Sequence, residues 1–400
     1  MNRRSFVQSL GASAVGLLTL EESAGTLAAA AQQAAAPARQ GRPDMSSLIR
    51  IGSNENPYGP AASVLEAVST SAKEGNRYPG PVQQKLIDAI AGKFSVPADH
   101  VMLSGGSGDI LNAVVKAFTS KTKALVSGVP SYEQPVRTAQ AIGNLVKEVP
   151  LDADLRLDLA AMGAKSIGAG LVYICNPNNP TSTSVALKDV GTLIDKVVTA
   201  SPTTLILVDE AYFEYSELPG FDTAAPYVLK YPQVIVARTF SKIHAMAGMR
   251  AGYALAQPKT IALMRAYHSN SGMSVMTMAA ATASLLDTAN LEKNRTANRE
   301  VRKVTVDAFT SAGYRVAHSD ANFVFVDIKR ESKGFQEACR QQGVAVGRAF
   351  PPMTTWARIS IGTQAEMEKA IPVFMKVLSA PPLAQTASYE HLDSLPSELT

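Results

Sequence analysis

Polar side chains suited to chemistry follow directly after two apolar runs in the sequence. Residues 205–208 are apolar, and they lead into Asp209 and, three residues later, Tyr212. Residues 234–237 are also apolar, and they lead through Thr239 and Ser241 to Lys242. In parallel α/β sheets, ligands bind outside the carboxyl ends of the strands. The two segments therefore offer a carboxylate, a phenol, two hydroxyls and an amine to one ligand.

Two more segments have a similar layout. The apolar run 171–175 leads into the segment 176–181, where two prolines force an extended, turning backbone that exposes asparagine side chains such as Asn179. The glycine-rich segment 104–109 precedes a helix-like stretch, 110–118. The free N–H groups and the dipole at such a helix start suit a phosphate.

The elements that must hold these residues have the pattern of an α/β fold. Short, nearly continuous apolar runs at 124–127, 171–175, 205–208 and 234–237 alternate with helix-length segments such as 187–198. Such runs are typical of strands buried on both faces of a mainly parallel sheet. From about residue 290 the pattern changes to a charged helix, strands near 322–328 and 357–361, and a helix near 335–342, which predicts a smaller α+β domain.

The N-terminus predicts export. Arg3 and Arg4 precede an apolar stretch that ends at Leu20, and an alanine-rich segment with several A-x-A sites continues to Ala38. This pattern is typical of a twin-arginine signal, which would take the protein to the periplasm. The alternative is an amphipathic N-terminal helix on a cytoplasmic protein, which Glu21 and Glu22 favour. The apolar stretch is shorter than the roughly 20 residues of a spanning helix, so we expect no membrane span in the mature protein.

Composition excludes several classes of function. The net charge of +4 is small for 400 residues, and no basic run interleaved with aromatics is present, which argues against nucleic acid as a partner. The cysteines, Cys175 and Cys339, are too far apart for a CxxC pair, and the five histidines show no metal-ligand spacing. We expect no metal site and two buried, inert thiols.

Several motifs, in this order, resemble those of the fold-type I pyridoxal 5′-phosphate (PLP) enzymes. Within that group the sequence is most similar to the class I/II aminotransferases, and among these to the histidinol-phosphate aminotransferase family. The resemblance covers about residues 49 to 363. It is carried by Asn54-Glu55-Asn56-Pro57-Tyr58-Gly59, Arg77-Tyr78-Pro79, Asn176–Thr181, Asp209-Glu210-Ala211-Tyr212, Ser241-Lys242 with Arg250, and Arg358-Ile359-Ser360-Ile361-Gly362.

The resemblance implies roles around the ring of the cofactor. Lys242 would form a Schiff base with PLP and move a proton, and Asp209 would keep the pyridine nitrogen protonated. Tyr212 and Asn179 would hydrogen-bond the ring oxygen beside the imine. Tyr132 would stack on the ring.

The resemblance also implies which residues hold the cofactor phosphate. Ser107 and Gly108 would bind it at the start of a helix. Thr239, Ser241 and Arg250 would bind it from the opposite side.

Further residues are implied at the substrate and between subunits. Arg358 would clamp the substrate carboxylate through two parallel hydrogen bonds, and Asn54, Tyr58 and Arg348 would also lie at the substrate. Tyr78 would reach the cofactor phosphate of a neighbouring subunit, which implies a homodimer with shared sites.

The resemblance also predicts the domain organisation. Residues 1–40 are expected to be the signal and linker, 41–75 an N-terminal arm and part of the small domain, and 76–289 the large PLP-binding domain. Residues 290–380 would form the small C-terminal domain, and 381–400 a tail.

The sequence departs from the family pattern at several places. Ser182 and Ala245 stand where the family often has glycine, which changes backbone freedom more than chemistry. The segment 347–353 is shorter and richer in proline than the loop that helps to hold a substrate phosphate in histidinol-phosphate aminotransferases. The sequence therefore leaves the substrate open.

We predict a ping-pong aminotransferase that moves an amino group from a donor such as glutamate to a 2-oxo or phosphorylated carbonyl acceptor. A PLP-dependent decarboxylase or lyase is the alternative, because such enzymes share Lys242, Asp209 and Arg250. A non-catalytic binding protein is disfavoured by the complete set of catalytic residue types.

Overall fold

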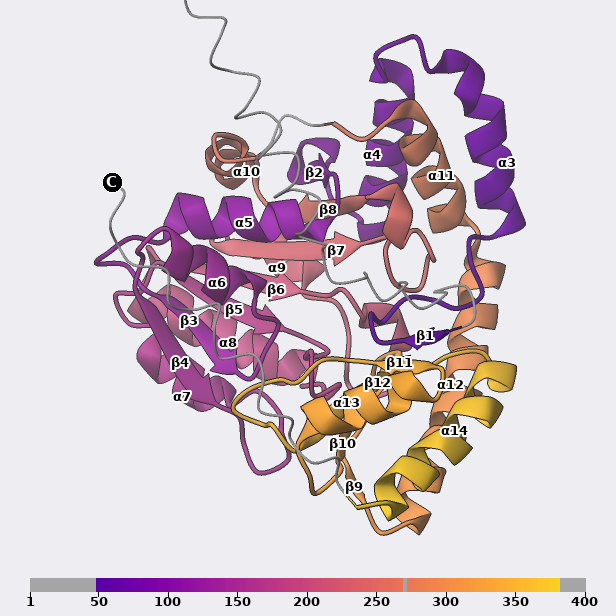
Figure 1. Cartoon of the computed structure of the whole chain (residues 1–400). Coiled ribbons are helices and arrows are strands. Elements are labelled where there is room, and N and C mark those ends of the chain that lie inside the picture. Colours follow the sequence, from indigo (N-terminus) through magenta and orange to yellow (C-terminus); the bar gives the residue numbers. More distant parts are fainter. Residues whose placement is uncertain (1–47, 269–271, 382–400) are drawn as a thin grey trace, which may run out of the picture. The chain divides into compact units, whose positions relative to one another are not determined.

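The computed structural model describes residues 48–268 and 272–381 (Figure 1). The predicted export signal at 1–40 and residues 382–400 of the predicted tail lie outside the described residues. No helix among residues 48–268 and 272–381 is long and apolar enough to cross a membrane.

A seven-stranded sheet carries the segments that end in polar residues. Its strands lie in the order β2-β8-β7-β6-β5-β3-β4, and β8 alone runs antiparallel to its two neighbours. This confirms the predicted mainly parallel sheet. The strands are β2 (Val101–Ser104), β3 (Leu125–Val129), β4 (Val146–Pro150), β5 (Leu171–Cys175), β6 (Leu205–Asp209), β7 (Val234–Thr239) and β8 (Gly252–Leu255).

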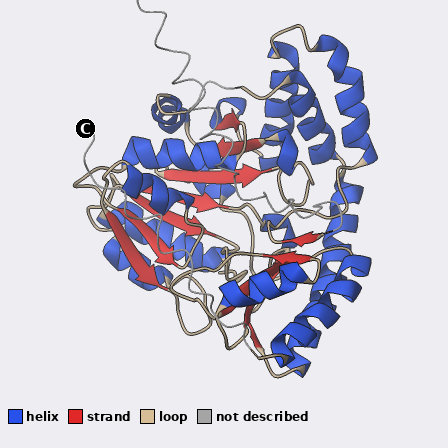
Figure 2. Ribbon diagram, viewed as in Figure 1, coloured by secondary structure: helices blue, strands red, loops and turns tan. Residues whose placement is uncertain are grey.

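Helices cover both faces of this sheet (Figure 2). Both faces of β5, β6 and β7 are therefore buried, which explains their continuous apolar sequence. One face packs against α4 (Gly80–Phe94), α7 (Leu159–Lys165), α8 (Leu187–Ala200), α9 (Ala225–Lys230) and α11 (Val275–Leu286), and the other against α5 (Ser107–Phe118), α6 (Gln134–Ala141) and α10 (Pro258–Arg265). Helix α3 (Ala62–Ser71) packs against α11.

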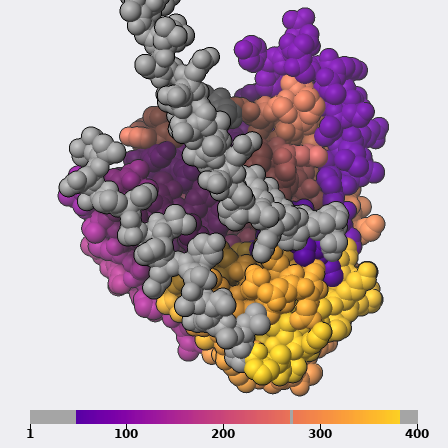
Figure 3. Space-filling model, viewed as in Figure 1, coloured from indigo at the N-terminus to yellow at the C-terminus, as the bar shows by residue number. Residues whose placement is uncertain are grey.

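Two small sheets and three helices form a second core. Strands β9 (Arg315–Val316), β10 (Phe323–Asp327) and β12 (Trp356–Ser360) are antiparallel, and β1 (Ile49–Ile51) pairs in parallel with β11 (Val344–Val346). Helices α12 (Thr288–Ser311), α13 (Ser332–Gln341) and α14 (Gln364–Ser379) complete this region. In the space-filling view, α13 and α14 form an orange and yellow surface away from the indigo surface of α3 (Figure 3).

The sequence predictions for this second region agree with the structure. Strand β10 lies within the predicted 322–328, and α12 begins at Thr288, near the predicted change of pattern. Helix α14 begins at a capping box in which Thr363 and Glu366 each bind the other's backbone N–H. Short 3₁₀ turns lie at Ala72–Glu74, Ala98–His100, Phe213–Tyr215 and Ala247–Met249. The domain boundaries at residues 76 and 290 stay a prediction.

Candidate active site

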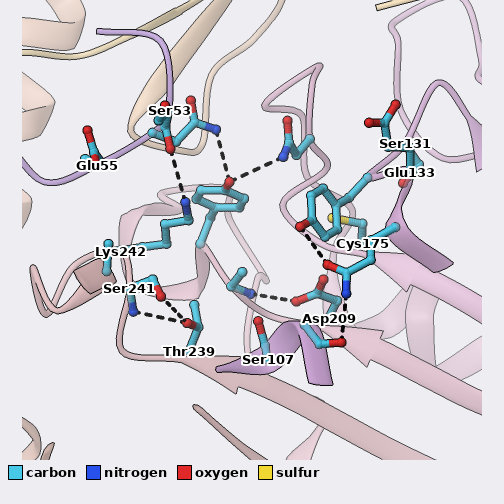
Figure 4. Close-up of a pocket in the computed structure, with 18 of the residues that line it drawn as sticks. Ser53, Glu55, Ser107, Ser131, Glu133, Cys175, Asp209, Thr239, Ser241 and Lys242 are labelled. Atoms are coloured by element: carbon cyan, nitrogen blue, oxygen red, sulfur yellow. Dashed lines mark hydrogen bonds between the residues drawn. The ribbon is translucent and has the colours of Figure 1, made fainter. Parts of the chain in front are cut away.

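The predicted site residues gather in one pocket at the carboxyl ends of β5, β6 and β7. The pocket has a volume of about 460 Å³. All the predicted site residues line it except Tyr58 and Tyr78. Figure 4 shows Lys242, Ser241 and Thr239 on one side of the pocket and Ser131, Glu133 and Cys175 on the other, with Asp209 and Ser107 between them.

Lys242 follows β7 and is half-buried in this pocket. Its Nζ atom donates to the carbonyl oxygen of Ser53 at 3.4 Å and lies 5.5 Å from the centroid of the Tyr212 ring. Loss of hydration in the pocket, together with the positive charge of Arg358, lowers the pKa of Lys242 to about 8. A useful fraction of this amine is therefore neutral, and hence nucleophilic, near neutral pH.

Asp209 ends β6 and is 2% exposed. One carboxylate oxygen accepts from the Tyr173 hydroxyl at 2.9 Å, and the other accepts from the Ala211 N–H at 3.2 Å. Burial raises the pKa of Asp209 to about 6, although both hydrogen bonds act in the opposite direction. Within the described residues no cation forms an ion pair with Asp209. A buried carboxylate without a cation suits the protonated ring nitrogen of PLP.

A buried network surrounds the Tyr212 hydroxyl. This hydroxyl accepts from the Asn54 amide at 3.0 Å and from the Asn179 amide at 3.4 Å, so its own hydrogen remains for a ligand oxygen. Burial raises the pKa of Tyr212, which keeps the phenol protonated. Asn54 adopts a left-handed φ of 54°, and Ser360 of β12 holds it there by donating to its side-chain oxygen and accepting from its backbone N–H, both at 2.8 Å.

The opposite end of the pocket has groups that are suited to a phosphate. Ser107 opens α5 directly after Gly106, whose φ is 117°. A Cβ atom at Gly106 would lie 2.5 Å from a terminal nitrogen of Arg250, so only glycine lets this guanidinium pass so close to the helix start. Thr239 and Ser241 hydrogen-bond each other at 3.0 Å beside it. Helix N–H groups, hydroxyls and a guanidinium fit the phosphate of PLP.

Gln134 links Tyr132 to Gly108 in the first turn of α5, and sequence analysis missed it. Its side-chain oxygen accepts from the Tyr132 hydroxyl at 3.0 Å, and its amide nitrogen donates to the Gly108 carbonyl at 2.8 Å. Tyr173 and Ser360 were missed as well. No local signal marks Gln134, whereas a tyrosine inside the apolar run 171–175 is an irregularity that could have been noticed.

Arg358 stands where a substrate carboxylate could bind. Its two terminal nitrogens donate to the side-chain oxygen of Asn179 at 2.8 Å and to the Gly52 carbonyl at 2.7 Å. Its Nε atom is buried and has no hydrogen-bond partner among the described residues. Burial lowers the pKa of Arg358. This buried cation is therefore oriented by the protein and still has donors to offer an anion.

A charged pair lies beside Arg358. Arg348 and Glu133 form an ion pair at 2.5 Å, and Glu133 also pairs with Arg137 at 3.0 Å. The centroid of the Phe350 ring lies 4.3 Å from the guanidinium carbon of Arg348 and 4.7 Å from that of Arg358. The side of the pocket next to Arg358 therefore has an aromatic face, and its carboxylate, Glu133, is shared by Arg348 and Arg137.

Two predicted residues lie outside the pocket. The Tyr58 side chain is 44% exposed and the Tyr78 side chain 98% exposed. The Tyr58 backbone N–H binds the side chain of Asn56, so this part of the motif forms a turn. The role of Tyr58 at the substrate and the role of Tyr78 in a second subunit stay predictions.

The two departures from glycine fall on left-handed backbone. Ser182 has a φ of 62° and Ala245 a φ of 55°. A side chain in this conformation costs roughly 1 kcal/mol relative to glycine. The family's glycines therefore have a backbone reason at both positions, and this chain tolerates the strain without changing the pocket-lining groups.

A buried ion network lies behind Asp209. Glu210 turns away from the pocket and pairs with Arg238 at 2.9 Å, and both side chains are 3% exposed. The Arg238 guanidinium also pairs with Glu214 at 3.2 Å and lies 3.9 Å from the Phe213 ring. Asp209 is the last residue of β6 and Arg238 the next-to-last residue of the neighbouring β7, so this network fixes the strand ends that carry the site.

Comparison with known proteins assigns the class. The family model for class I and II aminotransferases matches residues 46–374. The chain therefore belongs to the class I and II aminotransferase family, and it is a PLP-dependent aminotransferase.

Relatives within this family have two kinds of name. The chain is 32% identical to a histidinol-phosphate aminotransferase of Moorella thermoacetica, over 83% of this chain and 86% of the relative. It is 34% identical to an aromatic amino acid aminotransferase of Rhodococcus opacus, over 80% of this chain and 87% of the relative. No finding supports the alternative of a decarboxylase or lyase.

Solved structures of aminotransferases have a similar fold. A putative histidinol-phosphate aminotransferase of Erwinia carotovora atroseptica has a TM-score of 0.79 at 32% identity, with 83% of this chain and 96% of that chain covered. A histidinol-phosphate aminotransferase of Sinorhizobium meliloti in complex with PLP has a TM-score of 0.75 at 28% identity, with 82% and 90% covered.

Proposed function

We propose that this aminotransferase acts through the pocket residues named above, with Lys242 and Asp209 as its central pair. PLP, when bound, supplies an electron-accepting ring that eases the breaking of a bond at the substrate's amino-bearing carbon. The observation that carries the proposal is that an amine with a lowered pKa and a buried carboxylate without a cation line the same pocket.

The side chains divide the work. Lys242 takes the proton from the amino-bearing carbon of the substrate, because its lowered pKa matches that task near neutral pH. Asp209 provides the negative charge that keeps the ring nitrogen protonated. Tyr212 donates its hydrogen to the ring oxygen, and Asn54 and Asn179 hold Tyr212 in position. Arg358 orients the substrate through its carboxylate.

The substrate side of the pocket favours an amino acid with a planar, uncharged side chain. Phe350 offers an aromatic face, and Arg348 already has an ion-pair partner in Glu133. A phosphate monoester carries about two negative charges. To pair with Arg348 as well as with Arg358, it would have to compete with Glu133. We therefore infer that an aromatic amino acid and its 2-oxo acid are one substrate pair, and that a dicarboxylic amino acid such as glutamate is the other amino donor.

The absorption spectrum of the purified holoenzyme tests the reaction. Single amino acids are added without an acceptor, and the visible band of the bound cofactor and the keto acid are measured. Loss of the band with one keto acid per site is expected. Carbon dioxide release without keto acid would overturn the assignment of roles in favour of a lyase.

Steady-state kinetics test the substrate class. We expect kcat/KM for phenylalanine with 2-oxoglutarate to exceed that for histidinol phosphate by about tenfold or more, which corresponds to about 1.4 kcal/mol. A preference for histidinol phosphate would overturn the substrate proposal and leave the aminotransferase class intact.

We also propose a homodimer with shared sites. The support is the 98% exposure of Tyr78, a large aromatic side chain on the surface of one chain. In a mixture of Tyr78→Ala and Lys242→Ala subunits, about half of the dimers are mixed and each has one intact site, so activity should recover to about a quarter of the wild-type value. Recovery to no more than the activity of Tyr78→Ala alone would overturn the sharing.

Export remains a proposal of its own. Its support is the segment Asn2-Arg3-Arg4-Ser5-Phe6-Val7, which lies ahead of the family match that begins at residue 46. Replacing both arginines with lysine should keep the protein in the cytoplasmic fraction of the cell, because the twin-arginine route is read from this pair. Equal periplasmic amounts of both forms would contradict the proposal.

A further inference from the structure

Among the described residues, Tyr173 is the only tyrosine in the fully buried part of an apolar layer, and Tyr132 packs against the edge of that layer. It lies in the middle of β5, whose parallel register with β6 sets Tyr173 beside Leu207 and Cys175 beside Asp209. The layer on this face of the sheet, against α5, consists of aliphatic residues such as Ile110 and Leu111. The Tyr173 side chain is 0% exposed. A hydroxyl at this depth must find a partner within the protein.

Its partner is the carboxylate at the base of the pocket. The Tyr173 hydroxyl donates to Asp209 Oδ2 at 2.9 Å. Of the described residues, Tyr173 is the only one whose side chain donates to Asp209, because the remaining donor is the backbone N–H of Ala211.

The other ionisable groups around Asp209 are directed elsewhere or lie across the pocket. Glu210 is turned to Arg238, and the Cys175 thiol donates to the Pro177 carbonyl at 3.4 Å. The remaining ones that act on Asp209 or are acted on by it are Lys242, Tyr132 and Tyr212. The phenol of Tyr173 is therefore the group placed to adjust this carboxylate.

The effect of the phenol follows from its chemistry. Burial opposes the charged form of Asp209, whereas a donated hydrogen bond favours it. The hydrogen bond thus lowers the pKa of Asp209, which burial alone would raise further. It also limits rotation of the carboxylate, because each oxygen is then held by one donor.

We propose that Tyr173 is a positioning residue for the cofactor, which acts by keeping the Asp209 carboxylate ionised and fixed in orientation towards the pocket. This inference rests on the proposed role of Asp209. It assigns a function to a residue that lies outside the lining of the pocket and touches neither cofactor nor substrate.

Tyr173→Phe tests the inference, because it removes one oxygen atom and keeps the ring. Two properties are measured: the dissociation constant of PLP from the reconstituted enzyme, and the pH dependence of the visible band of the bound cofactor. Loss of a hydrogen bond to a charged group predicts PLP binding that is about tenfold weaker or more. It also predicts that the acid limb, which is the low-pH transition of the visible band, moves to higher pH by about one unit. Values within twofold of the wild type, with an unmoved acid limb, would overturn the inference.

Two controls separate this inference from the role of Asp209 itself. Tyr215→Phe removes the hydroxyl of another buried tyrosine, 3% exposed, which is not a hydrogen-bond donor to Asp209, and both properties should stay unchanged. In Asp209→Asn, PLP binding should weaken, and adding Tyr173→Phe should then change it by less than about twofold. If Asp209→Asn binds PLP as tightly as the wild type does, the proposed role of Asp209 is wrong. If Asp209→Asn weakens binding but Tyr173→Phe changes neither property, only the inference about Tyr173 is wrong.

A second variant covers the case in which Tyr173→Phe does not fold. Replacement of Tyr173 with 3-fluorotyrosine makes the phenol more acidic and therefore a stronger donor. The acid limb should then move to lower pH, the opposite direction from Tyr173→Phe. A shift to higher pH would contradict the inference.

Discussion

The base and the rim of the pocket are built in different ways. The base consists of Asp209, Tyr212, Asn179 and Lys242, which follow or end strands of the large sheet, and the first three are 5% exposed or less. The rim consists of Glu133, Arg348 and Phe350, which lie in loops and at a helix start.

The energetics of the two regions differ as well. The Arg348 and Glu133 side chains are 45% and 32% exposed, so water and salt weaken their interaction. The hydrogen bonds at the base are buried, so losing a partner there costs more. The contrast teaches that the groups proposed for the chemistry are fixed by buried contacts, whereas those proposed for substrate choice are held by contacts that water and salt can weaken.

The largest effect should come from Lys242→Ala at the base. We expect a loss of about 10⁴-fold or more in kcat, because in the proposed function the amine acts both as nucleophile and as proton carrier. Transamination is measured by keto-acid formation, and Lys188→Ala, an exposed position on α8, is the matched control. Activity above a hundredth of the wild-type value would contradict the contrast between base and rim, because the reaction would then not depend on the residues of the base.

Asp209→Asn should lower kcat by about 10²-fold to 10³-fold, through loss of a buried electrostatic contact. The same change should stabilise the protein without PLP. The pKa of Asp209 is raised by folding, so its contribution to stability is present below the unfolded pKa near 4 and is lost as pH rises through about 6.

The free energy of unfolding of the Asp209→Asn apoenzyme should therefore exceed that of the wild type by about 1 to 3 kcal/mol at pH 8, with little difference at pH 4. Denaturant titration at both pH values measures this. A variant that is less stable than the wild type at pH 8 would show that the charged Asp209 carboxylate does not destabilise the folded apoenzyme.

Arg358→Lys tests the boundary between the two regions. Lysine keeps the charge but cannot bind Asn179, the Gly52 carbonyl and a carboxylate at once. We expect kcat/KM to fall by about 10²-fold for every carboxylate substrate alike, which corresponds to about 2.7 kcal/mol. A loss confined to one substrate would show that Arg358 contributes to substrate choice, as proposed for the rim residues, and not to binding of every substrate carboxylate.

The smallest effect should come from Glu133→Gln at the rim. Removing the partner of Arg348 frees a cation, so the ratio of kcat/KM for glutamate to that for phenylalanine should rise about threefold to tenfold. Added salt should reduce the change. Glu148→Gln, an exposed glutamate on β4, is the control, and an unchanged ratio in Glu133→Gln would argue against a role of the pair in specificity.

The sequence predicted the base better than the rim for a physical reason. Strands β5, β6 and β7 lie within two residues of their predicted bounds, because burial on both faces demands continuous apolar runs. Polar residues directly after such runs must then meet at one edge of the sheet.

Contacts between distant parts of the chain could not be predicted in this way. Ser360 holds Asn54 across 306 positions, and Tyr173 reaches Asp209 across 36. Neither pairing leaves a local pattern in the sequence. Tyr58 shows the opposite problem, since it belongs to a matching motif and yet its side chain is largely outside the pocket.

The buried network of Arg238, Glu210 and Glu214 limits how this lineage can change over generations. Loss of Arg238 leaves the buried Glu210 without its cation, and loss of Glu210 leaves the buried Arg238 with the partly exposed Glu214 as its partner. Breaking a buried pair costs up to about 3 to 5 kcal/mol, against a net stability of about 5 to 15 kcal/mol. Replacement of this pair by apolar residues therefore has to pass through intermediates that fold poorly. Descendants of this chain should diversify at the rim long before they alter the ions behind Asp209.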